Sequence, residues 1–444
     1  MPKPQHRYLA FRRSSVALIS TPATAARFFI ESTLPGTTRI LVYRLLPTAY
    51  CLFSLSTTAA ELPQEIAPLF QPPARLQNQF GNYSSLLTFT NGTRVQSAAD
   101  WQKRREEIRT LWQNEIGQWP PLLEKPRFEI LNTTNRASFT QHSIRVEVAP
   151  NFLLNGYLLI PSRAERTAAP TSSSPSFPSV KHPAVIVPFY DPETSVGLTT
   201  NQLRDFASEL AKRGFIALAI GSPGGDARKP DTAGAQCQPL HFLGYIAANC
   251  HTALATLTNV DPARIAIVGH SYGGKWAMFA AAFHEKFAAG VWSDPGIVFD
   301  ESRPNINYWE PWYLGADPNI TRKPGLPTAS NPRTGAYKRL FESGRDLHEI
   351  QVLMAPRPFL VSGRSEDPPE RWHALNRINE VYNLLNATNR VAMSNRPGHN
   401  PTPESNEQIY IFLEHFLKPT STDAQPAQPP PNIHPPAHAA SAPQ

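Results

Sequence analysis

The segment "GHSYGGKW", from Gly269 to Trp276, contains two arrangements of residues that could do chemistry. Read as Gly-x-x-x-x-Gly-Lys, it is typical of a loop that holds a phosphate with backbone N–H groups and a lysine. Read as Gly-x-Ser-x-Gly, it is typical of a tight turn that exposes a nucleophilic serine, here Ser271. A phosphate loop needs Ser or Thr after its lysine to bind Mg²⁺. Trp276 follows the lysine, so the sequence favours the nucleophilic serine.

A nucleophilic serine needs a base that takes its proton and an acid that orients the base. His399 follows the apolar run "NRVAMSN", and Asp367 follows the run "RPFLVSG". The three residues then occur in the order Ser, Asp, His, which is one of the known orders of a catalytic triad. Asp367 is the preferred acid, and Asp294, at the end of "AAGVWSDP", stays open as the alternative because it also follows an apolar run.

The elements that must position these residues follow from hydrophobic patterning. The segments "FEILN", "SIRVEVAP" and "NGYLLIPS" alternate as antiparallel strands do. Six buried-type runs follow: "PAVIVPFY", "FIALAIGSP", "RIAIVGHS", "AAGVWSDP", "RPFLVSG" and "NRVAMSN". Helical patterns cover residues 98–118, 202–213, 242–257, 274–284, 371–385 and 404–417. This alternation predicts an α/β fold with a mainly parallel sheet covered on both faces, whose site lies at the carboxyl ends of the strands.

On the elbow around Ser271 and the order of the three residues, the region from about Phe128 to Leu417 resembles an α/β-hydrolase. The resemblance implies a mainly parallel central sheet between helices, an N-terminal helical and β extension, and a long insertion after the sixth strand. It also implies that Ser271 attacks a carbonyl carbon, that His399 acts as base and then acid, and that the chosen aspartate orients the imidazole. The oxyanion would bind the backbone N–H of Tyr272 and a second N–H, from Phe189 or Tyr190.

A narrower resemblance concerns the residues around the elbow. The elbow is similar to the Gly-Cys-Ser-Arg-x-Gly-Lys pattern of glucuronoyl esterases at Gly269, Ser271, Gly274 and Lys275. That resemblance implies that Lys275 contacts sugar hydroxyls. His270 and Tyr272 depart from the pattern, so neither a uronate-ester specificity nor an arginine oxyanion donor carries over. Acetyl-xylan-esterase-like and prolyl-oligopeptidase-like enzymes share the order of the triad, but the chain lacks the seven-blade repeat of large prolyl oligopeptidases.

An aromatic segment, "NINYWEPWYLGADPNI", lies between two of the expected strands. Aromatic faces suit the apolar faces of sugar rings, so Trp309 and Trp312 are candidate substrate-binding residues. A local hydrophobic mini-core beneath a long loop remains an equal alternative.

The positive charge of the chain is concentrated near its start. The first 60 residues carry seven Lys or Arg and one acid, Glu31, and account for six of the seven excess positive charges. This distribution argues against a nucleic-acid partner. Arg39 and Arg44 precede a short apolar run and small residues, the order of a signal peptide, so we expect cleavage after Ala60 and export. The run is too short for a stable membrane span, and we expect the true translation start nearer Ile40.

The expected organisation is a leader at 1–60, an N-terminal extension at 61–127, a catalytic domain at 128–418 and a disordered Pro/Ala-rich tail at 419–444. A second low-complexity segment covers 167–180. Cys237 and Cys250 either pair or remain two buried thiols, and neither has a second cysteine at zinc-ligand spacing.

The sequence as a whole predicts an exported serine hydrolase that cleaves an ester, in particular a carbohydrate ester, without a cofactor or metal. Its partner would be a small-molecule or polysaccharide ester, and its oligomeric state is left open. Two alternatives stay open: a prolyl-oligopeptidase-like serine peptidase, and a non-catalytic glycan-binding protein on a hydrolase scaffold.

Overall fold

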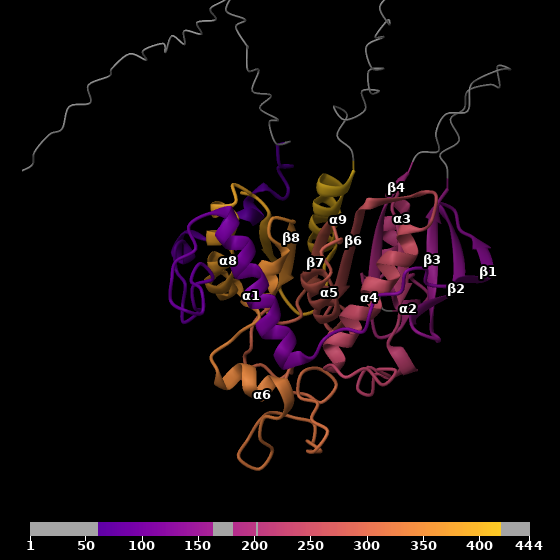
Figure 1. The fold of residues 1–444 in the computed structure, drawn as a ribbon. Helices are drawn as coiled ribbons and strands as arrows, with labels where there is room; N and C mark the ends of the chain where they lie inside the picture. Colours follow the sequence, from indigo (N-terminus) through magenta and orange to yellow (C-terminus); the bar gives the residue numbers. More distant parts are fainter. Residues whose placement is uncertain (1–60, 163–180, 201–202, 419–444) are drawn as a thin grey trace, which may run out of the picture. The chain divides into compact units, whose positions relative to one another are not determined.

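The computed structural model describes residues 61–162, 181–200 and 203–418. The expected leader, the low-complexity segment at 167–180 and the expected tail lie outside the described residues. Within them, one sheet runs in the order β1-β2-β3-β5-β4-β6-β7-β8-β9 (Figure 1). Its strands are β1 (Phe128–Asn135), β2 (Phe139–Ala149), β3 (Phe152–Pro161), β4 (His182–Pro188), β5 (Ile216–Ile220), β6 (Val260–His270), β7 (Ala289–Ser293), β8 (Phe359–Gly363) and β9 (Val391–Asn395).

The sheet has an antiparallel part and a parallel part. β1, β2 and β3 pair antiparallel, and β3 pairs antiparallel with β5. From β5 through β4, β6, β7 and β8 to β9 every pairing is parallel. Both the three antiparallel strands and the six buried runs therefore agree with the expectation from hydrophobic patterning.

Helices cover both faces of this sheet. The helices are α1 (Ala98–Ile116), α2 (Pro192–Ser195), α3 (Phe206–Lys212), α4 (Pro239–Ala255), α5 (Tyr272–Phe283), α6 (Gly335–Glu342), α7 (His348–Gln351), α8 (Trp372–Leu384) and α9 (Pro403–Leu417). Short 3₁₀ turns occur at Ala67–Phe70, Ala74–Leu76, Pro223–Gly225, Val352–Met354 and Pro369–Arg371. Buried residues of α1, α4, α5, α6, α7 and α8 form one core, and those of α3 and α9 form another.

Alternation along the strands explains the two cores. Ile186 of β4 packs in the first core, whereas its neighbours Val185 and Val187 pack in the second. Successive side chains of a strand point to opposite faces, so a strand buried on both faces is apolar throughout. The N-terminal helix α1 shares the first core through Trp101 and Trp112, so residues 61–127 pack directly on the rest of the fold.

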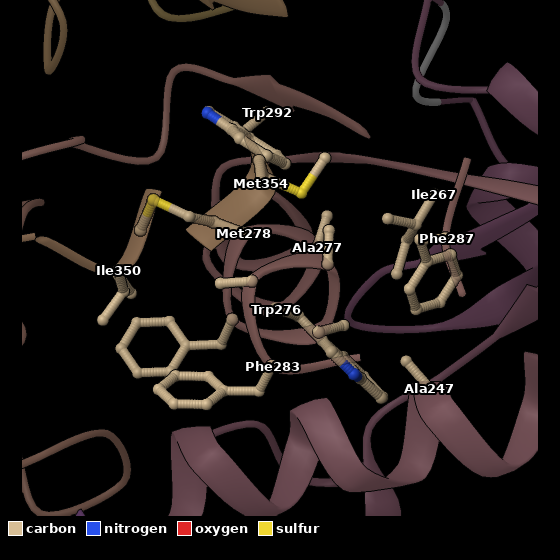
Figure 2. Close-up of a cluster of buried hydrophobic side chains, with 14 of the residues drawn as sticks. Ala247, Ile267, Trp276, Ala277, Met278, Phe283, Phe287, Trp292, Ile350 and Met354 are labelled. Carbon is tan, nitrogen blue, oxygen red and sulfur yellow. The ribbon is translucent and has the colours of Figure 1, made fainter. Parts of the chain in front are cut away.

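Helix α5, which follows the serine, is packed on all sides. Its described side chains are all buried. In Figure 2, Trp276 lies over Ala247 of α4 and Met278 points toward Ile350 of α7. Dense packing of this kind resists displacement, so the start of α5 is a fixed platform for whatever lies at the carboxyl end of β6.

Two further expectations concern crosslinks and membrane contact. Cys237 and Cys250 are free thiols and do not pair; Cys250 is buried, as the second alternative expected, whereas Cys237 is half-buried. Among the helices of the described ranges, none has both the length and the apolar content that crossing a bilayer requires.

Candidate functional site

Ser271 occupies the tight turn between β6 and α5. Its backbone has φ 53° and ψ −111°, a conformation that a residue with a side chain rarely adopts. A Cβ at Gly273 would lie 2.1 Å from the carbonyl oxygen of Pro188, and one at Gly269 would lie 2.1 Å from that of Gly273. Both glycines are therefore required by close backbone approach, and the strained serine between them has the geometry of a nucleophile elbow.

His399 lies in the loop after β9, and its Nδ1 is 2.7 Å from Oδ2 of Asp294. Asp294 follows β7 directly and is fully buried, whereas the His399 side chain is 30% exposed. Because an ionised carboxylate can only accept, Nδ1 carries the proton that it donates to Asp294. The Nε2 atom of His399 is then the basic nitrogen.

Several donors hold Asp294 in place as an anion. Its Oδ1 accepts the backbone N–H groups of Arg364, Glu366 and Asp367, at 2.7, 3.2 and 3.0 Å. The hydroxyl of Ser365 donates to Oδ2 at 3.0 Å. Burial alone raises the pKa of Asp294, but the bond from His399, the backbone donors and the charge of Arg396 together lower it to about 2.

Asp367 does not face the histidine, which corrects the preference of the sequence analysis. Its two oxygens accept the backbone N–H groups of Gly296 and Ile297, at 2.8 and 2.6 Å, and its side chain is fully buried. Burial and the negative charge of Asp294 raise the pKa of Asp367 to about 6. Both aspartates follow strands, but the loop after β8 turns Asp367 inward, so Asp294 is the carboxylate that meets His399.

The three backbone N–H groups expected to bind the oxyanion differ in whether they already have a hydrogen-bond acceptor. The N–H of Tyr272 begins α5, where the first N–H groups of a helix have no partner within the helix. The N–H of Phe189 instead donates to the carbonyl of Ile220 at 3.0 Å, so the expectation for Phe189 is corrected. This bond continues the ladder between β4 and β5. For the N–H of Tyr190, the described part of the chain provides no acceptor.

The Tyr190 side chain contributes a group that sequence reasoning missed. Burial raises the pKa of its phenol, while a hydrogen bond with the Ser271 side chain opposes that rise. The Tyr190 ring stacks on Tyr272, with 4.8 Å between ring centroids. The phenol hydroxyl therefore lies beside the nucleophile. The sequence identified Tyr190 only through its backbone, because no spacing rule shows which way a loop side chain points.

His270 brings His399 next to the elbow. The two imidazole rings lie with their centroids 4.7 Å apart, and His270 is the residue directly before Ser271. His270 is buried, its Nδ1 lies 3.1 Å from Oγ of Ser293, and burial together with nearby positive charges lowers its pKa well below the usual value. It therefore forms an uncharged wall beside His399, a role that its position in the motif did not indicate.

Lys275 is not available to a substrate in this structure, which corrects the expectation from the resemblance. Its residue is 2% exposed, and Nζ donates to the carbonyls of Pro295, at 2.5 Å, and Asn305, at 3.2 Å. The charge also lies 5.0 Å from the ring centroid of Tyr308. Because α5 points this side chain into the insertion that follows β7, Lys275 fastens that insertion to the elbow helix.

The two candidate substrate-binding tryptophans differ in how far they are buried. Trp309 is 1% exposed and packs against Tyr337 of α6, with ring centroids 6.0 Å apart, so its expected contact with substrate is corrected. Trp309 is part of the first core, together with residues of α1, α4 and α5, and not of a separate mini-core under the loop. Trp312 is half-buried, and the guanidinium of Arg228 lies 5.9 Å from its ring centroid. Trp312 therefore stays a candidate for contact with substrate.

One group of side chains has a spacing compatible with a cation. Ligand atoms of Asp294, Glu366 and His399 lie within 4.8 Å of one another. The Asp294 carboxylate already accepts from three backbone N–H groups, a hydroxyl and the imidazole, and Arg396 lies 4.0 Å from it. A saturated carboxylate beside a guanidinium suits the orientation of an imidazole better than the binding of a cation.

Comparisons with known proteins give one family match and several similar structures. Residues 247–328 match the model of the prolyl oligopeptidase family. A glucuronoyl esterase from Solibacter usitatus has a similar structure, with 17% identity, a TM-score of 0.58, and coverage of 76% of this chain and 99% of its own. A promiscuous CE15 esterase from a marine bacterial metagenome gives 15% identity and a TM-score of 0.56, covering 77% and 99%.

A CE15 glucuronoyl esterase from Caldicellulosiruptor kristjansonii gives 19% identity and a TM-score of 0.51, covering 82% of this chain and 98% of its own. No curated protein matches the sequence. At these identities the likeness concerns the fold. With the strand order and the elbow, it shows that this chain has the α/β-hydrolase fold expected from its sequence.

Proposed function

We propose that this protein is a serine hydrolase that cleaves a carboxylic ester through an acyl-enzyme. The observation that carries the proposal is the strained Ser271 beside a His399 whose Nδ1 is fixed by the buried Asp294. Strain at a serine between two obligatory glycines costs stability and has no evident structural benefit, so its value is in exposing the hydroxyl.

The steps follow from the atoms around the serine. His399 Nε2 removes the proton of the Ser271 hydroxyl as Oγ forms a bond to the ester carbonyl carbon. The developing oxyanion accepts from the N–H of Tyr272 and from Tyr190. His399 then gives its proton to the leaving alcohol, and water, activated by the same imidazole, releases the acid. Asp294 keeps its charge throughout and stabilises the imidazolium.

A carbohydrate ester is the substrate class we favour. Trp312 offers a partly open aromatic face and contacts Tyr313, whose ring centroid lies 6.2 Å from that of Tyr272 in the elbow, and the similar structures include glucuronoyl esterases. The family match over residues 247–328 supports a second candidate, a serine peptidase. We also keep the expectation of export, which rests on the charged, apolar and small residues before Glu61.

The deciding experiment is mass spectrometry of the full chain after exposure to a fluorophosphonate, with Ser271→Ala as the matched control. We expect one adduct, on Ser271, that the control lacks. A folded protein without that adduct would refute the proposal and leave the non-catalytic scaffold. Parallel assays with acetylated xylo-oligosaccharides, glucuronate esters and proline-containing peptide anilides then separate esterase from peptidase activity.

A further inference from the structure

The charges of Arg204 and Arg228 act on the hydroxyl of Tyr190, the tyrosine next to Ser271. Among the charges that act on Tyr190, those of Arg228 and Arg204 lower its pKa against the effect of burial. Both guanidinium groups are therefore close enough to the Tyr190 hydroxyl to influence it. The Ser271 side chain also acts on that hydroxyl, so both positive charges act on a tyrosine next to the nucleophile.

Arg204 belongs to the segment before α3 and reaches the loop of the histidine. Its Nη2 donates to Oδ1 of Asn400 at 2.5 Å, and Asn400 directly follows His399. The charge of Arg204 also contributes to the lowered pKa of His270. Arg204 therefore lies on the side of the site that is formed by the two histidines.

Arg228 reaches the site from a different segment, after the turn at Pro223–Gly225. Its guanidinium lies over Trp312, the half-buried aromatic residue of the insertion. The residue is exposed, so its charge is open to a ligand from solvent. A cation held on an aromatic face keeps its outer N–H donors available.

Within the described ranges, neither arginine forms an ion pair with a carboxylate. The acids in the neighbourhood have other partners. Glu310 accepts from Arg322 at 3.1 Å and from the N–H of Gly325 at 2.7 Å. Asp226 uses its Oδ1 to accept the backbone N–H of Arg228 at 2.8 Å.

We propose that the ester cleaved at Ser271 carries a second, free carboxylate, which Arg204 and Arg228 bind. This inference rests on the proposed hydrolase function and adds a substrate class to it. A guanidinium presents paired N–H donors that match the two oxygens of a carboxylate, and two of them from separate segments favour an anion over a neutral group. The expected substrate is an acidic ester, in which the charged group lies on either the acyl or the alcohol side.

The test compares esters that differ only in this charge. With the charge on the alcohol side, the pair is 3-acetoxybenzoate and 3-acetoxybenzamide; with the charge on the acyl side, it is monomethyl adipate and methyl adipamate. We expect kcat/KM, measured as acid release at constant pH, to favour the anionic member of one pair by roughly tenfold at low salt. The preference should shrink as ionic strength rises, because salt screens exposed charges.

Three variants assign the preference to residues. Arg204→Gln and Arg228→Gln should each reduce the ratio of anionic to neutral kcat/KM by roughly three- to tenfold. Arg94→Gln is the matched control, because Arg94 is an exposed arginine on the isolated bridge with Thr88. That control should keep the ratio of the unmodified protein.

A second assay measures how strongly each ester protects Ser271 from the fluorophosphonate. It compares the binding of the anionic and the neutral ester of a pair even where turnover is slow. Equal kcat/KM and equal protection within both pairs, on a protein whose Ser271 is labelled, would overturn the acidic-ester inference and leave the hydrolase intact. Failure to label Ser271 at all would instead overturn the proposed function. A preference that Arg94→Gln removes as fully as the other two variants would also refute the assignment.

Discussion

The ends of β7 and β8 carry the same chemical group and use it in opposite ways. Asp294 and Asp367 each follow a buried strand, and each is fully shielded from water. Asp294 turns toward His399, whereas Asp367 turns toward the backbone N–H groups of Gly296 and Ile297. The first holds a base, and the second closes the loop that leads away from the first. The place of an aspartate at the end of a strand therefore does not fix its role. The loop that follows the strand decides which groups the carboxylate meets.

The same division appears in other residue types. Trp312 is half-buried next to Arg228, while Trp309 is buried in the first core against α6. His399 lies against His270, the residue before Ser271, while His241 is enclosed between aromatic rings. Each pair has one member at the site and one in the interior. Comparing the members of a pair in one assay isolates what the site adds.

The largest contrast is expected for the two aspartates. Asp294→Asn should lower kcat for an ester by roughly 10³- to 10⁴-fold, because an amide can donate to Nδ1 and select the wrong tautomer of His399. Asp367→Asn should lower stability and leave turnover largely intact, since its oxygens contact the backbone N–H groups of Gly296 and Ile297 and the guanidinium of Arg371, at 3.7 Å, and not His399. Steady-state kinetics and urea unfolding of both variants measure the contrast. A larger loss of kcat in Asp367→Asn would reverse the assignment of the acid.

The tryptophans should differ next. Trp309→Ala should lower the free energy of unfolding by about 3–5 kcal/mol, since it removes a fully buried ring from a packed core. Trp312→Ala should cost much less stability and should raise KM for the preferred ester, because its ring is partly open. Thermal or urea unfolding, together with KM, gives both values. Similar losses of stability with an unchanged KM would mean that Trp312 is also only a packing residue.

The smallest effect concerns pH and the interior histidine. Burial, with a contribution from Arg109, lowers the pKa of His241 to about 3, so the folded protein keeps this ring neutral. The unfolded chain protonates it near pH 6.5. The stability that depends on a neutral His241 is therefore complete above pH 6.5 and is lost as the pH falls from 6.5 toward 3, by up to about 1.4 kcal/mol per pH unit.

His241→Phe should remove this part of the acid sensitivity, because a phenyl ring fits between Trp119 and Phe283 without a proton to bind. Urea unfolding at pH 8, 6 and 5 measures this effect: the free energy of unfolding should fall less with decreasing pH in the variant than in the unmodified protein. Burial lowers the pKa values of His251 and His284 to about 4 and 3, so these two residues should account for the pH dependence of the free energy of unfolding that remains in the variant. Parallel curves for variant and unmodified protein would show that His241 is protonated in both states or in neither.

Much of the fold could be predicted from the sequence because strands, helices and tight turns depend on residues that are close together along the chain. The six apolar runs became the parallel strands β4 to β9, and the helical patterns became helices within a few residues of the expected bounds. The motif around Ser271 was equally local, since Gly269 and Gly273 are demanded by backbone approach within a single turn. His399 was selected among the histidines that follow Ser271 because it comes just after the apolar run that became β9.

The sequence by itself determined the strands, the elbow and the kind of residues that end each strand, because these depend on neighbours within a few positions. Only the tertiary structure decided which aspartate meets His399, that Lys275 and Trp309 are buried, and that the charges of Arg204 and Arg228 act on Tyr190. Those outcomes depend on how loops from distant strands fold over the carboxyl edge of the sheet. A loop side chain can turn toward the site or toward the core at similar local cost, so packing between segments selects the direction.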